Sequence, residues 1–207
     1  MRVLLLLMSS ALLCTLVACD KGAVQATPNA QAPRQGVLRS DAAPLQTPQV
    51  TKPNTSALPP NARVKVIPES AYPPIGEKVE FTEAQWKERL NPSQYNIMVQ
   101  EGTERPFTSP LLKIKADGVY HCAACEAPLF ASETKYKSGT GWPSYYQPIA
   151  DGRVGSKTDM KLGVPRTEVH CARCGGHLGH VFNDGPKPTG KRYCINGESL
   201  LFSPAPE

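Results

Sequence analysis

Seven cysteines stand out in this 207-residue chain as residues whose type and spacing could support chemistry. Four of them form two C-x-x-C pairs, Cys122 with Cys125 in HCAAC and Cys171 with Cys174 in HCARC. Each pair places two thiolates on one side of a tight turn, and two such turns complete the four-sulfur shell of a structural zinc site. We therefore expect these cysteines to bind Zn²⁺. Two disulfides or a rubredoxin-type iron site are the alternatives for the same residues.

Cys194, in KRYCINGESL, belongs to no such pair. An inert buried cysteine is the ordinary interpretation, but its neighbours favour a reactive thiol. Arg192 carries a cation that stabilises a thiolate, and a strand here would place Arg192, Cys194 and Asn196 on one face. His177 and His180, in HLGH, are free for proton transfer if the metal shell is already complete. These five residues predict an active site built around Cys194.

The elements that must position these residues begin near Phe81. The Thr-x-x-Gln capping-box pattern of Thr82 and Gln85 predicts a helix over EAQWKERL, and SQYNIMVQ predicts a second. Beyond Glu101, Gly, Pro, Asp and Asn separate short apolar runs, which is typical of strands joined by tight turns. We expect a small, mainly antiparallel β domain with helices leading in. The predicted strands are LLKI, GVYHC, APLF, TEVHC, HLGHVF, RYCI and SLLF.

The N-terminus predicts export. Arg2 precedes an apolar run that is too short for a membrane-spanning helix and suits a secretory signal over residues 1–18. The run ends at Ala18-Cys19, which resembles the lipobox of bacterial lipoproteins, where the signal is removed and the cysteine is lipidated. We expect Cys19 to carry the lipid, which would anchor the protein to a membrane of the cell envelope, facing the periplasm. An ordinary signal peptide with a chance cysteine is the alternative.

A proline-rich segment separates this signal from the folded part. No Phe, Tyr or Trp occurs between Asp20 and Ala71. Such a segment cannot bury enough apolar surface to offset the entropy of ordering, so residues 19–77 predict a disordered tether and residues 78–207 the folded domain. The formal net charge of +5 comes without a lysine or arginine block, which argues against a nucleic-acid partner.

Several long motifs together resemble the B-type peptide-methionine (R)-S-oxide reductases. The resemblance covers about residues 81–202. It implies a mainly β fold of two antiparallel sheets, of the β-tent (Mss4-like) type, with short N-terminal helices and a four-cysteine zinc site. The substrate it implies is the R epimer of methionine sulfoxide in oxidised proteins. The motifs are GTERPFTSPLL, DGVYHCAACEAPLF, SGTGWPSYY and HCARCGGHLGHVFNDGPKPTGKRYCINGESL.

The resemblance also implies roles for individual residues. Cys194 matches the catalytic cysteine of an R-x-C-x-N motif, whose thiolate attacks the sulfoxide sulfur and becomes a sulfenic acid. His177 and His180 match the histidines that hold and polarise the oxygen, and Asn196 matches a residue that orders this network. Trp142 matches the tryptophan that receives the substrate methyl group, and Arg192 of the motif is assigned to substrate binding. Without the resemblance, Trp142 would be interpreted as a core residue.

The chain departs from many family members at Thr140, where they have a second, resolving cysteine. Thr140 cannot attack the sulfenic acid of Cys194, and the zinc cysteines cannot do so without losing metal. The sequence therefore predicts a one-cysteine enzyme. Its reductant would be an external thioredoxin-like protein or a small thiol.

Three other classes of protein compete with this interpretation. A zinc-supported binding module would not need Cys194 together with His177, His180 and Asn196. A zinc-ribbon nucleic-acid binder would need a basic aromatic face and no export signal. A disulfide-exchange enzyme would need a second free redox cysteine. We expect a monomeric reductase that repairs oxidative damage in the cell envelope.

Overall fold

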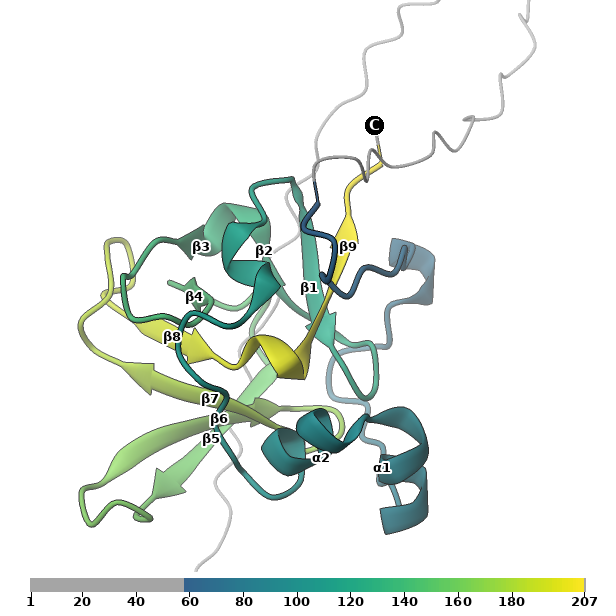
Figure 1. The fold of residues 1–207 in the computed structure, drawn as a ribbon, viewed down its shortest axis with the longest axis horizontal. Coiled ribbons are helices and arrows are strands. Elements are labelled where there is room, and N and C mark those ends of the chain that lie inside the picture. The colour runs from purple at the N-terminus through teal and green to yellow at the C-terminus, as the bar shows by residue number, and fades with distance from the viewer. Residues whose placement is uncertain (1–57, 207) are drawn as a thin grey trace, which may run out of the picture. The chain divides into compact units, whose positions relative to one another are not determined.

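The computed structural model describes residues 58–206, and within them the strands form two antiparallel sheets (Figure 1). One sheet has the order β2-β1-β9, and the other has the order β3-β4-β8-β7-β6-β5. The expected mainly β fold with short leading helices is confirmed. The predicted signal, Cys19 and the first part of the tether lie outside the described residues. The strands are β1 Gly118–Cys122, β2 Pro128–Ala131, β3 Lys135–Tyr136, β4 Ser144–Tyr145, β5 Val154–Asp159, β6 Arg166–Cys171, β7 His177–Phe182, β8 Arg192–Ile195 and β9 Leu200–Pro204.

Two short helices, α1 (Glu83–Arg89) and α2 (Pro92–Met98), precede the sheets, as the sequence predicted. Each begins with a complete capping box, in which the cap side chain accepts the backbone N–H three residues on and the side chain of that residue accepts the backbone N–H of the cap. Pro92 occupies the first position of α2, where its missing N–H costs nothing. No helix within residues 58–206 is long and apolar enough to cross a membrane. The two boxes pair Thr82 with Gln85 and Asn91 with Gln94.

The predicted strand at LLKI is wrong, because Pro110–Lys113 forms a 3₁₀-helix, η2. The side chain of Ser109 accepts the N–H of Leu111, and Pro110 at the first position favours helical backbone. The strands β3, β4 and β5 were not predicted. β3 and β4 are two residues long, and β5 has an outward-facing polar run, SKT. The other 3₁₀-helices are η1 Glu69–Ala71, η3 Ser132–Thr134 and η4 Gly197–Ser199.

Aromatic side chains from both sheets meet in the core. The ring of Tyr145 on β4 stacks on Phe130 of β2, with centroids 4.3 Å apart. Tyr120 of β1 packs edge-on against Tyr145 at 5.2 Å and contacts Phe202 of β9 at 4.9 Å. All four residues are fully buried, and burial of each phenylalanine side chain contributes about 1.5–3 kcal/mol. These contacts fix the six-stranded sheet, which carries Cys194, against the three-stranded sheet.

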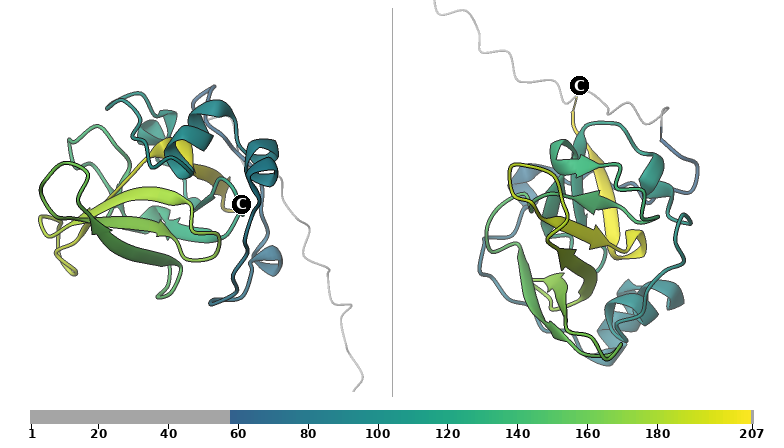
Figure 2. Two further views of the ribbon diagram at one scale, coloured as in Figure 1. Left: turned by 90° about the horizontal axis from the view of Figure 1, so that it is seen from below. Right: turned by 90° about the vertical axis from the view of Figure 1, so that its left-hand side faces the viewer.

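The described domain begins earlier than the sequence predicted. Residues 58–77, expected to be part of a tether, lie against the domain, and residues 63–67 among them bond to the edge strand β9 (Figures 1 and 2). Phe202 donates its N–H to the carbonyl of Arg63 at 2.9 Å, and Lys65 donates to the carbonyl of Phe202 at 3.0 Å. Composition predicted disorder because the segment has few apolar side chains. The unpaired backbone of the edge strand supplies hydrogen bonds that composition does not reveal.

Candidate active site and metal centre

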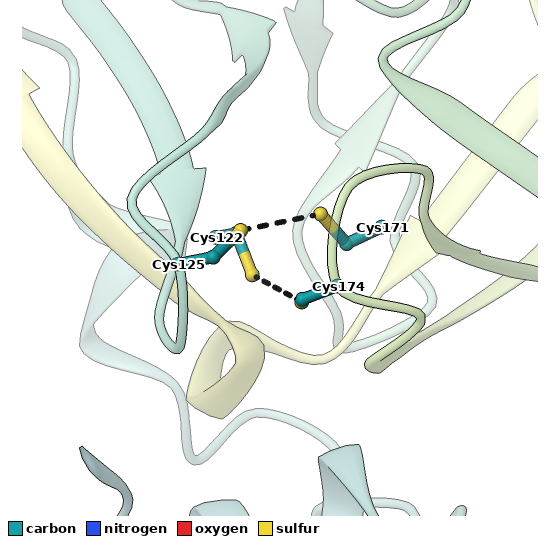
Figure 3. A group of neighbouring side chains, drawn as sticks. All are labelled: Cys122, Cys125, Cys171 and Cys174. Carbon is teal, nitrogen blue, oxygen red and sulfur yellow. Dashed lines mark hydrogen bonds between the residues drawn. The ribbon is translucent and has the colours of Figure 1, made fainter. Parts of the chain in front are cut away.

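The four cysteines of the two C-x-x-C pairs meet in one buried cluster (Figure 3). Their sulfur atoms all lie within 4.8 Å of one another, and two of the pairs are 3.6 Å apart. Four sulfurs around Zn²⁺, with Zn–S bonds of about 2.3 Å, would be separated by about 3.8 Å. A disulfide would need about 2.05 Å. The cluster therefore has the dimensions of a four-thiolate metal shell, and these residues could hold a metal ion.

One type of backbone turn presents both pairs. Glu126 donates its N–H to the carbonyl of Cys122, and Gly175 donates to that of Cys171, each at 2.9 Å. Both donors have left-handed backbone, with φ of 60° and 76°. The neighbouring thiols and burial raise the pKa of Cys122 well above its ordinary value, so a cation is needed if all four are to be thiolates. Because β1 and β6 lead into the turns, a metal here would join the two sheets.

Cys194 lies on β8 in the middle of the six-stranded sheet. Its neighbours in the register are Ser144 on β4 and His180 on β7, and His180 is in turn opposite Glu168 on β6. Directly opposed residues of antiparallel strands share one face of the sheet. Four polar side chains therefore form a row across the sheet, with the thiol next to an imidazole.

The two histidines each have a carboxylate partner. Nε2 of His180 lies 2.8 Å from Oδ2 of Asp159, and Nδ1 of His177 lies 3.1 Å from Oε1 of Glu168. Strict alternation along β7 would separate the two rings, but their centroids are 5.6 Å apart, where the pairing of β6 with β7 shifts register. Burial lowers the pKa of His177, and the Glu168 carboxylate opposes this shift without cancelling it.

A pocket of about 120 Å³ opens beside Cys194. Trp142 donates its indole N–H to the carbonyl of Glu104 at 3.1 Å, and the N–H of Glu104 donates to Oδ1 of Asn196 at 3.1 Å. The backbone of Glu104 thus links two walls of the pocket. The lining residues are Thr103, Trp142, Arg166, Gly179, His180, Phe182, Cys194 and Asn196.

Asn196 reaches this pocket by a different route from the one predicted. β8 ends at Ile195, and Asn196 begins the η4 turn, so strand alternation does not explain its position. Its backbone N–H and its side-chain amide both donate to the carbonyl of Leu178, at 2.8 and 3.0 Å. The turn and β7 together fix the Asn196 amide beside Cys194.

Arg192, assigned above to substrate binding, is not among the residues that line the pocket. Its guanidinium binds both carboxylate oxygens of Asp184 at 2.9 Å and lies 4.3 Å from the ring centroid of Phe182, which lines the pocket. Burial raises the pKa of Cys194, whereas the Thr140 hydroxyl and the Arg192 cation lower it. The net direction is upward, so the cation noted in the sequence offsets only part of the desolvation.

Sequence reasoning missed Glu104, Asp159 and Glu168. Glu168 is 2% exposed and Asp159 is 7% exposed, and buried carboxylates require partners. Glu168 could have been noticed as an acid inside the short run TEVHC, two residues before His170. Asp159 ends a strand that was not predicted, so its pairing with His180 had no local signal.

The chain matches known proteins over the part that holds this site. The SelR domain model matches residues 90–204, which is more than half of the chain. The chain is similar to the peptide methionine sulfoxide reductase MsrB of Agrobacterium fabrum, with 55% identity over 127 residues, covering 61% of this chain and 94% of the relative. It is also similar to MsrB of Leptospira interrogans, with 57% identity over 125 residues, covering 60% of this chain and 95% of the relative.

The matched residues include both sheets and the residues that line the Cys194 pocket. The chain therefore belongs to the B-type methionine sulfoxide reductase family and is an oxidoreductase of that class.

Proposed function

We propose that this enzyme reduces the R epimer of methionine sulfoxide in oxidised proteins and peptides, with Cys194 as the nucleophile. The observation that carries the proposal is the position of Cys194, opposite His180 on the neighbouring strand and beside a pocket walled by Trp142 and Asn196. The indole of Trp142 offers an apolar surface for the methyl group of the substrate. The polar side of the pocket suits the sulfoxide oxygen.

The chemical step begins with attack of the Cys194 sulfur on the sulfoxide sulfur. Two electrons pass from the Cys194 sulfur to the substrate sulfur as the S–O bond breaks. The transient bond between the two sulfur atoms then breaks, so that the oxygen ends on Cys194 as a sulfenic acid with one proton and methionine leaves as a thioether. His180 lines the pocket and His177 lies next to it, and in this proposal the pair donates and returns the proton that the oxygen needs while the bond weakens. Asp159 and Glu168 orient these rings.

Regeneration requires a reductant from outside this chain. Within residues 58–206 every other cysteine belongs to the four-sulfur cluster. An external thiol would attack the sulfur of the sulfenic acid, release water and form a mixed disulfide with Cys194. A second external thiol would then cleave that disulfide and restore the Cys194 thiol. A thioredoxin-like protein with two thiols, or two molecules of a small thiol, would supply both equivalents.

The metal centre has a structural role in this proposal. Cys122, Cys125, Cys171 and Cys174 would hold Zn²⁺, and the ion would contribute folding free energy. Four thiolates complete a tetrahedral shell, so the cluster leaves no position for substrate. The acid–base work belongs to the histidines on β7.

We also propose that the enzyme acts at a membrane of the bacterial cell envelope. The support lies in residues 1–18, with the features of a signal, and in Cys19 at the end of the apolar run. Lipidation of Cys19 would anchor the chain to the membrane facing the periplasm, with residues 20–57 between the anchor and the enzyme. Mass analysis of the protein purified from membranes tests this proposal. An N-terminal peptide that begins with an unmodified Cys19, or with residues before it, would contradict it.

A single-turnover experiment tests the proposed reaction. The reduced chain, freed of external thiol, is mixed with a peptide that carries R-methionine sulfoxide. We expect one methionine per chain and a dimedone adduct on Cys194. The matched control is Cys194→Ser, which keeps a hydroxyl in the same place and should form no methionine. If the folded, metal-loaded protein with a free Cys194 thiol makes no methionine, the reductase mechanism fails and a binding module becomes the better interpretation.

A further inference from the structure

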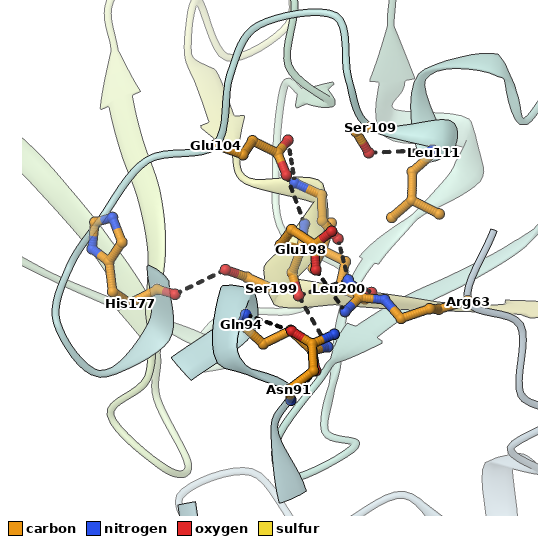
Figure 4. A network of polar contacts seen from close by, with 11 residues as sticks. Arg63, Asn91, Gln94, Glu104, Ser109, Leu111, His177, Glu198, Ser199 and Leu200 are labelled. Atoms are coloured by element: carbon orange, nitrogen blue, oxygen red, sulfur yellow. Dashed lines mark hydrogen bonds and ion pairs between the residues drawn. The ribbon is translucent and has the colours of Figure 1, made fainter. Parts of the chain in front are cut away.

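The turn that follows Cys194 is held from two directions by ionic side chains (Figure 4). This turn, residues 196–200, begins with Asn196 of the pocket and includes η4. It also reaches β7, because the hydroxyl of Ser199 donates to the carbonyl of His177 at 3.1 Å. Any movement of the turn would therefore be transmitted to Asn196 and to the backbone of His177.

Arg63 holds the carbonyl side of the turn. One terminal nitrogen of its guanidinium lies 2.8, 2.6 and 3.0 Å from the carbonyl oxygens of Gly197, Glu198 and Leu200, so its two N–H groups are shared among three acceptors. The other lies 3.1 Å from the carboxylate of Glu198. Arg63 belongs to residues 58–77, outside the matched family range of 90–204. Because the guanidinium is planar and contacts three carbonyls at once, it restrains the turn more than the flexible ammonium group of a lysine would.

Glu104 holds the amide side of the same turn. Its two carboxylate oxygens accept the N–H groups of Gly197 and Glu198, at 2.8 and 2.9 Å. The backbone of Glu104 simultaneously binds the amide of Asn196 and the indole of Trp142. One residue therefore connects the turn to two walls of the pocket.

Packing leaves the turn little freedom to adjust. A Cβ atom added at Gly197 would lie 1.9 Å from Oγ of Ser109, so the turn is in close contact with the start of η2. Burial raises the pKa of Glu104 and the Glu198 carboxylate adds to that rise, while the two amide donors and, to a smaller extent, the Arg63 cation lower it. The positive charge of Arg63 thus favours the ionised form of the Glu104 carboxylate, which binds the amides of the same turn.

We infer that Arg63 and Glu104 are positioning residues that hold Asn196 and Trp142 in the geometry needed for sulfoxide reduction. The inference rests on the proposed role of Cys194. It assigns to residues 58–77 a part in forming the substrate pocket. Cys194 itself is held independently, by the pairing of β8 with β4 and β7. Loss of the Arg63 or Glu104 contacts should therefore displace Asn196 and Trp142 more than it displaces the thiol of Cys194.

The test compares variants of the full chain in a single turnover with an R-methionine sulfoxide peptide, followed by rapid quenching. Arg63→Gln and Glu104→Gln should slow methionine formation by about 10- to 100-fold, because misplaced positioning groups cost rate in this range. Alkylation of Cys194 by iodoacetamide should stay within about twofold of the unchanged chain. Arg63→Lys should not restore the rate, since an ammonium cannot reproduce the planar guanidinium contacts.

The matched control is Arg153→Gln. Arg153 also fastens the N-terminal segment, by donating to the carbonyl of Pro73 at 2.7 Å, but it does not touch the turn. The inference is overturned if Arg153→Gln slows methionine formation as much as Arg63→Gln. It is also overturned if Arg63→Lys and Glu104→Gln, with folding verified by thermal melting, react at the unchanged rate. If the unchanged chain itself forms no methionine, the proposed function fails instead.

Discussion

The hydroxyl oxygen of Thr140 lies 3.8 Å from the sulfur of Cys194. It is held there by a hydrogen bond of 2.9 Å to the hydroxyl of Ser138, which in turn bonds Ser144 at 2.7 Å. This loop brings an oxygen to the place from which a sulfur could attack a sulfenic acid. Residue 140 therefore has the position that a resolving cysteine would need, but the threonine hydroxyl cannot form a disulfide with Cys194.

Thr140→Cys should therefore convert the enzyme into a two-cysteine reductase. The new sulfur would start near the Cys194 sulfur and need only a small approach to reach the disulfide distance of about 2.05 Å. After one turnover without external thiol, we expect methionine, the loss of two free thiols and no dimedone adduct. Thiol titration and mass analysis measure all three.

Ser156→Cys is the control for this substitution, since it adds a cysteine at an exposed position on β5, three strands from β8 in the sheet order. That variant should keep the dimedone adduct on Cys194. A Thr140→Cys chain that also keeps the adduct, with both thiols free, would show that the loop cannot deliver its side chain to Cys194.

The pH dependence of the thiol should respond to Arg192. Burial raises the pKa of Cys194, so less thiolate is present at neutral pH, and the Arg192 cation partly opposes that rise. Arg192→Met removes the cation and should raise the pKa further. At pH 8, the rate of alkylation by iodoacetamide should then fall several-fold, and its rise with pH should shift upward.

Lys191→Met provides a control of the same charge change, because Lys191 is exposed and its ammonium binds Asn183. It should leave the alkylation profile in place. An Arg192→Met profile that coincides with that of the unchanged chain would mean that Asp184 already cancels the effect of the cation at the thiol.

Much of this architecture was predictable because its signals are local. The capping box of Thr82 and Gln85 defines α1 within four residues. Within each C-x-x-C turn the spacing alone places two thiols side by side, so the cluster could be predicted once both turns were found in one domain.

The rest depends on contacts between distant residues. Asp159 meets His180 only because β5, β6 and β7 pair in the observed register. Arg63 bonds a turn 134 to 137 residues further along the chain, and it does so from a proline-rich segment whose composition predicts disorder. Amino-acid composition indicates how much apolar surface a segment can bury, whereas this segment is held by hydrogen bonds from its backbone and from the Arg63 guanidinium.

Acid should weaken the fold partly through Glu101. Its carboxylate binds the ammonium groups of Lys157 and Lys161, which lower its pKa to about 2. Because the folded pKa is below the unfolded one, this contribution is present above about pH 4.5 and is lost as the pH falls towards 2. The side chain is 29% exposed, so we expect about 1 kcal/mol after screening.

Glu101→Gln should flatten the fall in the free energy of unfolding between these pH values, as measured by urea denaturation. Glu83→Gln is the control, because Glu83 forms an exposed pair with Lys87 within α1. A Glu101→Gln chain with an unchanged pH slope would show that water screens the pair completely.

Removal of the metal should unfold the domain, since the two sheets are joined at the cysteine cluster. The turn after β1 carries Cys122 and Cys125, and the turn after β6 carries Cys171 and Cys174. Structural zinc sites in small peptides contribute about 10–16 kcal/mol of apparent binding free energy, which is comparable to the stability of a whole domain. We expect one Zn²⁺ per chain by elemental analysis, and loss of cooperative melting when a strong chelator removes it. Cys171→Ser should have the same effect, whereas Cys194→Ser should keep both the metal and the melting temperature. A Cys171→Ser chain that melts like the unchanged protein would show that the cluster is not what joins the sheets.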